Sequence, residues 1–243
     1  LVPGFALITG ASSGLGAALA RALPADRPLL LTGRDAGRLE ALKAELAHGG
    51  RPVETVAADL AGDSGRRAVI EAASARPLAL LVNNAGLGAW GRFQENDPAR
   101  ELEMVQVNCL APVALTRALL PRLLENARQQ EGRAGLILVA STAAFQPLPN
   151  FATYAATKAF DRFLGEALAQ ELAGQPIAVL TLCPGPTATQ FFRRAALPGV
   201  RARTMDPDRV ARRALAALGR RDRLVPGLLN ALAVQASALL PRA

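Results

Sequence analysis

The sequence predicts an α/β fold, with one doubly wound parallel sheet of about seven strands and helices on both of its faces. Apolar runs of strand length alternate along the chain with segments of helical period, as in parallel sheets whose strands are buried on both faces. At 243 residues and 51% hydrophobic content, the chain can bury a large core. Because no internal repeat or low-complexity linker divides it, we expect a single domain over 1–243.

The strands and helices can be placed in order along the chain. Pro24 ends the first helix, Gly49 closes the second, and Pro207 stands in the first turn of a late one. The polar stretch 125–133 is expected to be a surface loop, and 224–227 a short last strand and turn. The other expected strands are 5–9, 28–32, 53–58, 78–82, 135–140 and 177–182. The expected helices are 14–23, 35–47, 64–74, 99–110, 112–128, 150–173 and 207–219.

The net charge of +8 is concentrated toward the end of the sequence. Residues 193–243 hold 11 Arg and 3 Asp, whereas acidic and basic residues are equal in number over 1–192. Such a segment can attract an anionic substrate or an acidic surface, or it can simply be a solvated face. Because no recognised nucleic-acid-binding module accompanies it, we expect no nucleic-acid partner.

The chain has two cysteines, Cys109 and Cys183, and one histidine, His48. They are too few and too scattered for a disulfide framework or a cysteine-based metal site, so we predict no metal. A reducing cytoplasm is the simplest location. We also expect no membrane-spanning helix, because no run of 18 or more apolar residues is present. We expect no export signal, because the sequence opens on a strand and not on a basic segment followed by an apolar one.

A glycine-rich loop from Thr9 to Gly16 joins the first expected strand to the first expected helix. Glycines there let the backbone turn tightly and approach a pyrophosphate at the helix N-terminus, as in Rossmann-type folds. Gly10 to Gly14 also matches the Gly-x-Ser-x-Gly turn of serine hydrolases. That chemistry needs a histidine late in the chain, and His48 is the only histidine, so we reject the hydrolase interpretation.

Tyr154 is the only tyrosine in the chain, and Lys158 follows it by one helical turn. An ammonium about 4 Å from a phenol, at an effective dielectric constant near 20, favours the phenolate by ~4 kcal/mol. The pair could therefore perform general acid/base chemistry. By itself the spacing is equally compatible with two surface residues that share a helix.

Taken together, these motifs resemble the short-chain dehydrogenase/reductase family over about residues 5–190. Their order and spacing carry the resemblance, since each motif alone is weak. The matching residues are Thr9, Gly10, Gly14, Gly16, Asp59, Leu60, Asn83, Asn84, Ala85, Gly86, Asn108, Ser141, Tyr154, Lys158, Pro184, Gly185 and Thr189.

The resemblance implies hydride transfer with a nicotinamide cofactor. It implies that Tyr154 exchanges a proton with the substrate oxygen, while Lys158 lowers the Tyr154 pKa and holds the nicotinamide ribose. Ser141 then bonds the substrate carbonyl, Asn108 holds a water that links Lys158 to solvent, and Thr189 bonds the carboxamide. The residues expected to bind the cofactor are Thr9, Gly10, Ser12, Ser13, Gly14, Leu15, Gly16, Arg34, Asp59, Leu60, Asn83, Ala85, Gly86, Tyr154, Lys158, Pro184, Gly185, Thr187 and Thr189.

The end of the second strand favours NADP(H) over NAD(H). A carboxylate is expected there for NAD, whereas an arginine suits the 2′-phosphate of NADP. Gly33 stands at the position of the acid and Arg34 follows it. Asp35 also fits as the N-cap of the next helix. Ser13 and Arg38 are further candidates for the phosphate, although a solvated side chain is the simpler interpretation of Arg38.

Two later segments are expected to set specificity. By the same resemblance, 186–219 covers the substrate, and its aromatic and basic side chains suit an apolar substrate that bears an acidic group. These side chains are Phe191, Phe192, Arg193, Arg194, Arg201 and Arg203. The apolar tail 228–243 either covers the cleft or packs on a partner subunit. Contact with an anionic membrane surface is a less favoured alternative.

The sequence thus predicts an NADP(H)-dependent oxidoreductase that interconverts a carbonyl and a secondary alcohol, with Tyr154 as general acid/base. The resemblance also implies a homodimer or homotetramer. The alternative from another functional class is a non-catalytic NADP(H)-binding protein that reports redox state. A complete set of Ser141, Tyr154, Lys158 and Asn108 argues against this alternative, because binding a dinucleotide requires no serine there.

Overall fold

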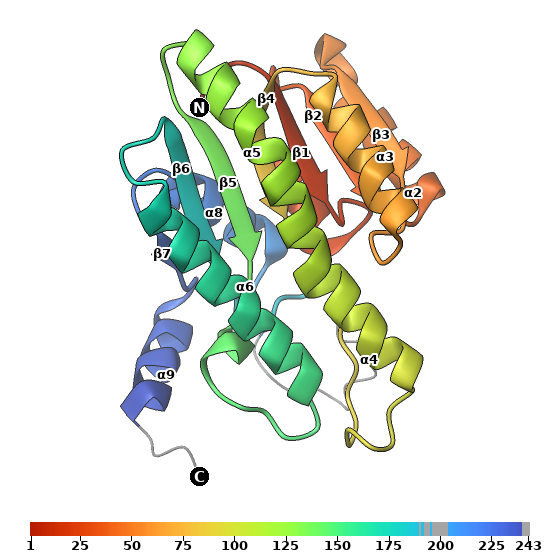
Figure 1. Ribbon diagram of the computed structural model, residues 1–243, viewed down its shortest axis with the longest axis vertical. Helices are drawn as coiled ribbons and strands as arrows, with labels where there is room; N and C mark the ends of the chain where they lie inside the picture. The colour runs from red at the N-terminus through yellow and green to blue at the C-terminus, as the bar shows by residue number, and fades with distance from the viewer. Residues whose placement is uncertain (190, 192–194, 196–203, 240–243) are drawn as a thin grey trace.

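The computed structural model describes residues 1–189, 191, 195 and 204–239 (Figure 1). They form one parallel sheet in the order β3-β2-β1-β4-β5-β6-β7. The strands are β1 (Phe5–Thr9), β2 (Leu29–Gly33), β3 (Val53–Ala57), β4 (Leu78–Asn83), β5 (Ala134–Val139), β6 (Ile177–Leu182) and β7 (Arg223–Leu224). The helices are α1 (Gly14–Ala22), α2 (Ala36–Leu46), α3 (Asp63–Ser74), α4 (Pro98–Val105), α5 (Ala111–Gln129), α6 (Ala152–Glu171), α8 (Pro207–Ala217) and α9 (Leu228–Leu239), with short helical turns η1 (His48–Gly50), η2 (Gln106–Leu110) and η3 (Thr142–Phe145).

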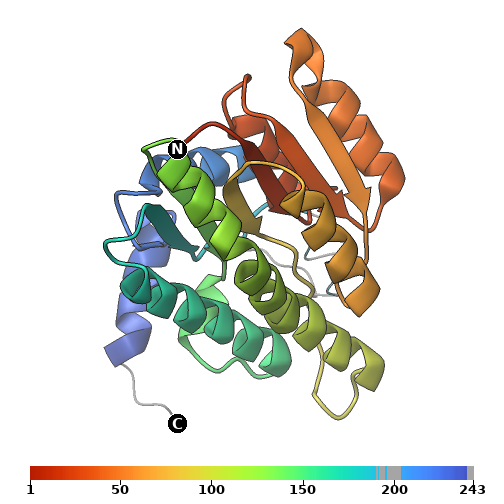
Figure 2. The same cartoon turned by 45° about the horizontal axis from the view of Figure 1, so that its top comes forward.

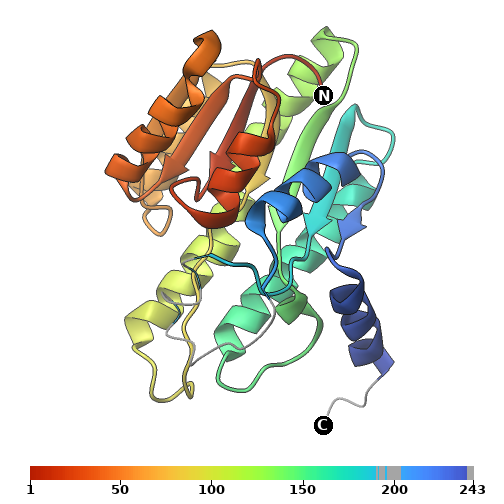
Figure 3. The same ribbon diagram turned by 180° about the vertical axis from the view of Figure 1, so that it is seen from behind.

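Helices cover both faces of the sheet, as Figures 1 and 3 show from opposite sides. On one face, Leu39 of α2 and Val210 of α8 share a buried apolar cluster with α1 and with strand residues such as Ile8. On the other face, Leu115 of α5 and Val69 of α3 belong to a second cluster, against which α6 packs. Strands covered on both faces read as continuous apolar runs. The predicted doubly wound α/β fold is therefore confirmed.

The two helices expected at 99–110 and 112–128 form one continuous rod in the structure, which lies beside α6 in Figures 1 and 2. The turn η2 between α4 and α5 is a π-helix, in which the Ala111 N–H donates to the Gln106 carbonyl, five residues earlier. Pro112 was expected to begin a new helix. Pro112 does lie in the first turn of α5, but η2 joins this turn directly to α4, so the missing N–H of the proline does not interrupt the helix.

The polar stretch 125–133 was expected to be a surface loop, and most of it is not. Helix α5 continues to Gln129, and Asn126 and Ala127 on it are buried. Asn126 Nδ2 donates to the Pro3 carbonyl at 2.9 Å and to the Leu78 carbonyl at 3.2 Å. A polar side chain in this stretch thus ties the N-terminal segment to the sheet.

The rod Pro98–Gln129 is the one helix in the described part of the chain that is long and apolar enough to span a membrane by length and composition. Within its most apolar window, 44% of the residues are buried inside the protein. Its Leu115, Leu119 and Leu123 pack in the core against the sheet. A helix that covers a sheet has this composition for that reason.

All strands of the parallel sheet point the same way, so their carboxyl ends meet at one edge (Figure 1). The strand order reverses between β1 and β4, because the chain builds β2 and β3 on one side of β1 and the later strands on the other. In open α/β sheets, ligands bind outside the carboxyl ends of the strands at this point. The candidate site lies there.

Candidate active site

A cavity of about 690 Å³ opens at the carboxyl edge of the sheet, and all but four of the predicted site residues line it. The loops after β1, β2, β3, β4, β5 and β6 all contribute to its wall. The predicted residues that line it are Gly10, Ser12, Ser13, Gly14, Leu15, Arg34, Asp59, Leu60, Ala85, Gly86, Ser141, Tyr154, Lys158, Pro184, Gly185, Thr187 and Thr189.

The four other predicted residues, Thr9, Gly16, Asn83 and Asn108, support the wall from behind. Asn83 was expected to touch the cofactor, but it is buried and its Nδ2 donates to Thr116 Oγ1 of α5 at 2.9 Å. A Cβ at Gly16 would lie 2.4 Å from the Gly10 carbonyl oxygen, so this glycine is required by the packing of the loop.

Thr9 and Asn84 join the glycine loop to the segment after β4. Thr9 Oγ1 accepts hydrogen bonds from the N–H groups of Asn84 and Ala85, both at 2.9 Å. In return, Asn84 Nδ2 donates to the Thr9 carbonyl at 2.8 Å. Asn84 also lines the cavity, although the sequence analysis selected its neighbour Asn83. In a parallel strand, adjacent side chains point to opposite faces, and only the structure fixes which of the two faces the cavity.

The N-terminus of α1 fits an anionic group such as a pyrophosphate. Gly10 and Gly14 have positive φ of 65° and 59°, which lets the backbone fold tightly around the start of the helix. Ser13 is the N-cap residue, but its side chain makes no capping hydrogen bond, and the first turn contains no acidic residue. The helix N-terminus therefore presents unpaired N–H groups and a positive dipole end to the cavity.

Next to the glycine loop, Arg34 follows β2 and lines the cavity, with its side chain 48% exposed. Its Nη1 donates to Glu103 Oε1 of α4 at 2.6 Å, while Arg100 Nη1 holds the second oxygen of Glu103 at 2.6 Å. Asp35 accepts from the Arg38 N–H at 3.0 Å, as expected of an N-cap. A Cβ at Gly33 would lie 3.0 Å from Ser12 Oγ, so a larger residue at this strand end would displace Ser12.

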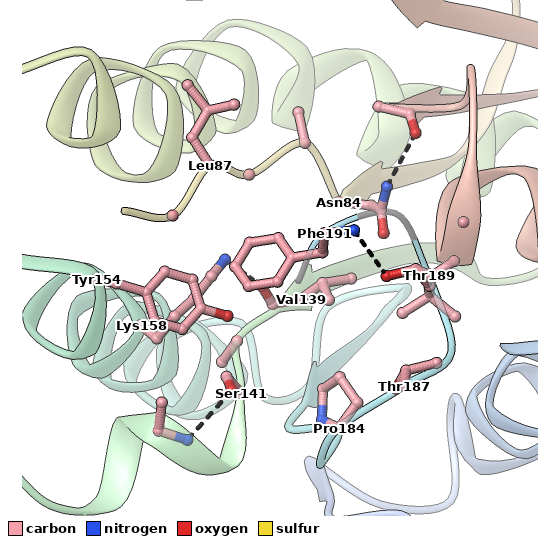
Figure 4. A pocket seen from close by; sticks show the side chains of 18 of the residues that line it. Asn84, Leu87, Val139, Ser141, Tyr154, Lys158, Pro184, Thr187, Thr189 and Phe191 are labelled. Atoms are coloured by element: carbon pink, nitrogen blue, oxygen red, sulfur yellow. Dashed lines mark hydrogen bonds between the residues drawn. The ribbon is translucent and has the colours of Figure 1, made fainter. Parts of the chain in front are cut away.

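Ser141, Tyr154 and Lys158 gather on one wall of the cavity (Figure 4). Ser141 ends the segment after β5 and caps η3, where its Oγ accepts from the Ala143 N–H at 3.1 Å. Tyr154 and Lys158 project from the first turns of α6, both buried. The Tyr154 ring stacks on Phe151 at a centroid distance of 4.2 Å, which fixes the direction of its hydroxyl.

The electrostatic surroundings of Tyr154 differ from the expectation. Burial raises the pKa of Tyr154, while Lys158 and a hydrogen bond with Ser141 lower it and Asp161 raises it again, with a net upward shift. The sequence predicted that Lys158 would lower this pKa. Lys158 does so, but burial and the charge of Asp161 outweigh it.

Asn108 sits on the π-helical turn η2 and is fully buried. Its Oδ1 accepts from the Leu87 N–H at 2.8 Å, and its Nδ2 donates to the Leu87 carbonyl and to Thr157 Oγ1, both at 2.9 Å. A Cβ placed on Gly86 would lie 3.6 Å from Asn108 Oδ1 and 3.4 Å from Lys158 Nζ. Asn108 therefore positions the loop that faces Lys158.

Comparison with known proteins decides the family. The family model described as short chain dehydrogenase matches residues 4–197. The chain belongs to the short-chain dehydrogenase/reductase family. Sulfoacetaldehyde reductase of Chromohalobacter salexigens is 38% identical over 192 residues, which cover 76% of this chain and 72% of that protein.

Two solved members of the family show the same fold. A short-chain dehydrogenase from Sphingobium yanoikuyae in complex with NADPH is 30% identical, with a TM-score of 0.82 over 98% of this chain and 94% of that one. A 3-ketoacyl-(acyl-carrier-protein) reductase from Brucella melitensis, complexed with NADH, is also 30% identical, with a TM-score of 0.79 over 91% and 96%. The resemblance found in the sequence is thus confirmed, and a nicotinamide cofactor is supported.

In this short-chain dehydrogenase/reductase, apolar side chains from several segments enclose the cavity beside Tyr154. Phe191 lies 5.1 Å from the Tyr154 ring, and Ala233 and Val234 of α9 also line the cavity. Asn230 of α9 donates to the Pro226 carbonyl at 3.0 Å and to Met205 Sδ at 3.3 Å. Part of the tail thus lies in the cavity wall, and its role as a cover or as a contact with a partner subunit stays a prediction. The predicted Phe192, Arg193, Arg194, Arg201 and Arg203 and the tail's last four residues lie outside the described residues.

Proposed function

We propose that this protein is an NADP(H)-dependent oxidoreductase that interconverts a carbonyl and a secondary alcohol, with Tyr154 as general acid/base. The observation that carries the proposal is the placement of Ser141, Tyr154 and Lys158 on one wall of the cavity that begins at the N-terminus of α1. The groups that can exchange a proton and the helix N-terminus that can bind a pyrophosphate thus line the same cavity.

Tyr154, Ser141 and Lys158 have different roles in the proposed reaction. Tyr154 gives its hydroxyl proton to the substrate oxygen during reduction and takes it back during oxidation, while Ser141 donates a hydrogen bond to the same oxygen. Lys158 stabilises the phenolate that forms and has one N–H left for the nicotinamide ribose, since two of its three are used by Val139 and Asp161. A nicotinamide bound here supplies or accepts the hydride.

The preference for NADP(H) is supported by the end of β2. Gly33 places no carboxylate there, and Asp35 is engaged as the N-cap of α2. Arg34 lines the cavity with a planar guanidinium suited to a phosphate. Glu103 already binds one nitrogen of this guanidinium, so a 2′-phosphate competes with the carboxylate for Arg34.

A panel of ketones and aldehydes, followed through the absorbance of NADPH, tests the activity. We expect turnover with at least one apolar carbonyl compound, and Tyr154→Phe should abolish turnover while leaving the Kd for NADPH within about twofold. If the wild-type protein binds NADPH but reduces nothing in the panel, the non-catalytic, redox-reporting alternative is favoured instead. A Tyr154→Phe variant with wild-type turnover would contradict the assignment of Tyr154.

The proposed substrate is an apolar carbonyl compound, because Leu148, Phe151, Phe191 and Val234 line the cavity with Tyr154. Arg100 is a second arginine in the lining and could hold an acidic group of the substrate. A matched pair of substrates, one carrying a carboxylate and one its methyl ester, tests this. The acid should have the lower KM, and Arg100→Gln should remove the difference.

We propose that the protein acts as a homo-oligomer in the cytoplasm. The rod Pro98–Gln129 and α6 lie side by side in Figures 1 and 2 and carry the exposed apolar residues Leu102, Val113 and Phe163. An exposed apolar face of this kind is typical of a subunit interface. Light scattering after gel filtration should give twice or four times 25.4 kDa, and Phe163→Glu should reduce it.

A further inference from the structure

A buried acid, Asp161, lies beside the lysine of the candidate active site. It follows Lys158 by three residues on α6, and its side chain is only 4% exposed. Asp161 Oδ2 accepts a hydrogen bond from Lys158 Nζ at 2.9 Å, and the same Nζ donates to the Val139 carbonyl at 2.9 Å. Two of the three N–H groups of Lys158 are thereby fixed, and the third is left for the cavity.

Among the described residues, Lys158 is the one that binds the side-chain carboxylate of Asp161. Its other carboxylate oxygen, Oδ1, is buried and has no hydrogen-bond partner within the part of the chain that the structure describes. A buried ion pair is usually no more stable than apolar side chains of similar volume, because both charges lose their hydration. The presence of this buried carboxylate is therefore better explained by a role in the active site than by a contribution to the stability of the fold.

The thiols near this pair carry no charge at neutral pH. Cys109 on η2 faces Lys158 and Asp161, and burial raises its pKa to about 11. Cys183 follows β6, and burial raises its pKa to about 12.

Farther along α6, the other charged side chains near the site pair with one another. Arg223 of β7 binds Glu166 at 2.7 Å, and Arg162 lies 3.8 Å from the same carboxylate. The charges that act on Tyr154 are therefore those of Lys158 and Asp161.

These two charges oppose each other at the Tyr154 hydroxyl. Lys158 favours the phenolate, whereas Asp161 disfavours it, and burial disfavours it further. Asp161 also holds Lys158 in its charged form, because it offsets the cost of burying the ammonium. The hydroxyl thus faces an ion pair of no net charge instead of a lone cation.

We propose that Asp161 is a positioning residue that fixes Lys158 against β5 and, by opposing its charge, keeps Tyr154 protonated, so that the site favours carbonyl reduction. In that direction the O–H bond of Tyr154 breaks and its proton joins the substrate oxygen. Reduction starts from the protonated phenol, whereas oxidation needs the phenolate first. The proposal rests on the proposed function, in which Tyr154 is the proton donor.

The sole tyrosine of the chain makes a direct test possible. Because Tyr154 has no other tyrosine beside it, the near-ultraviolet absorbance of tyrosinate in the whole protein titrates this one residue. Asp161→Asn keeps the shape of the side chain and an oxygen acceptor for Lys158 but removes the charge. We expect the Tyr154 midpoint to fall by about one pH unit or more relative to the wild type.

Glu166→Gln is the matched control. It removes an acid from the same helix, one that binds Arg223 instead of Lys158, and should leave the midpoint unchanged. Circular dichroism of the same samples establishes that each variant is folded. An unchanged or higher midpoint in folded Asp161→Asn would overturn the proposal.

If Asp161→Asn does not fold, the wild-type titration decides. The proposal requires a Tyr154 midpoint above the ordinary value of about 10, and a lower midpoint would overturn it. These absorbance measurements need no substrate. A protein that reduces no carbonyl compound but shows the expected shift would therefore contradict the proposed function while leaving the role of Asp161 intact.

Discussion

Replacing Arg34 by alanine tests how the protein selects its cofactor. A unit charge pair about 4 Å apart is worth about 1 kcal/mol in water and about 4 kcal/mol at an effective dielectric constant of 20. Arg34 is 48% exposed, so solvent screening places its interaction with a 2′-phosphate toward the lower figure. We take about 1.5 kcal/mol, which corresponds to roughly a tenfold change in affinity.

The assay is a pair of cofactor titrations at one fixed carbonyl concentration. Arg34→Ala should raise the KM for NADPH about tenfold and leave the KM for NADH within about twofold. Arg21→Ala is the matched control, since it removes an arginine of similar exposure that pairs with Glu45 at 2.6 Å and does not line the cavity. Equal losses for both cofactors in Arg34→Ala would refute the reasoning.

Removing the charge of Glu103 should have the opposite effect on NADPH binding, because Glu103 pairs with Arg34. Its carboxylate binds Arg34 at 2.6 Å, so it competes with a phosphate for the positive charge of the guanidinium. An ion pair of this exposure contributes up to about 1 kcal/mol. Glu103→Gln should therefore lower the KM for NADPH by about twofold to fivefold without changing that for NADH.

Two further predictions concern the support of the site. Asn108→Ala leaves the buried N–H and C=O of Leu87 without their partner, so it should lower the free energy of unfolding by about 2–4 kcal/mol, measured in urea. Thr157→Val, which removes the hydroxyl acceptor of Asn108 Nδ2 but leaves both bonds to Leu87, should cost less, and equal losses would contradict this account. Cys109 should react with iodoacetamide at pH 8 about a hundredfold more slowly than free cysteine, because burial raises its pKa to about 11. Mass spectrometry follows the labelling, and fast modification of the folded protein would contradict this reasoning.

Features that depend on local chemistry were visible in the sequence. Strands β1 and β6 were placed at their observed limits because each is a short apolar run bounded by glycine, proline or polar residues. The glycine loop and the Tyr154–Lys158 pair could be found because spacing alone puts their members together. The family comparisons confirm the resemblance that these motifs suggested.

Features that depend on distant partners were not visible. Nothing local distinguishes Asn84, which lines the cavity, from Asn83, which turns to Thr116. Asp161 was overlooked because an aspartate on a helix is usually solvated, although its spacing from Lys158 was a usable signal. Glu103 reaches Arg34 across 69 residues of sequence, a contact that only the folded sheet creates.

The π-helical turn η2 lets one continuous helix orient two sets of side chains correctly. Within it, Asn108 must face the Leu87 loop, and beyond it Leu115, Leu119 and Leu123 must face the sheet. Deleting one residue from η2 would restore a regular helix but rotate everything after it by about 100° relative to everything before it. Either the leucines or the asparagine would then leave its place. The extra residue therefore sets the rotation of Asn108 about the helix axis relative to the core leucines. Exposed residues of this helix can be substituted, but a residue cannot be inserted or deleted without losing one of these contacts.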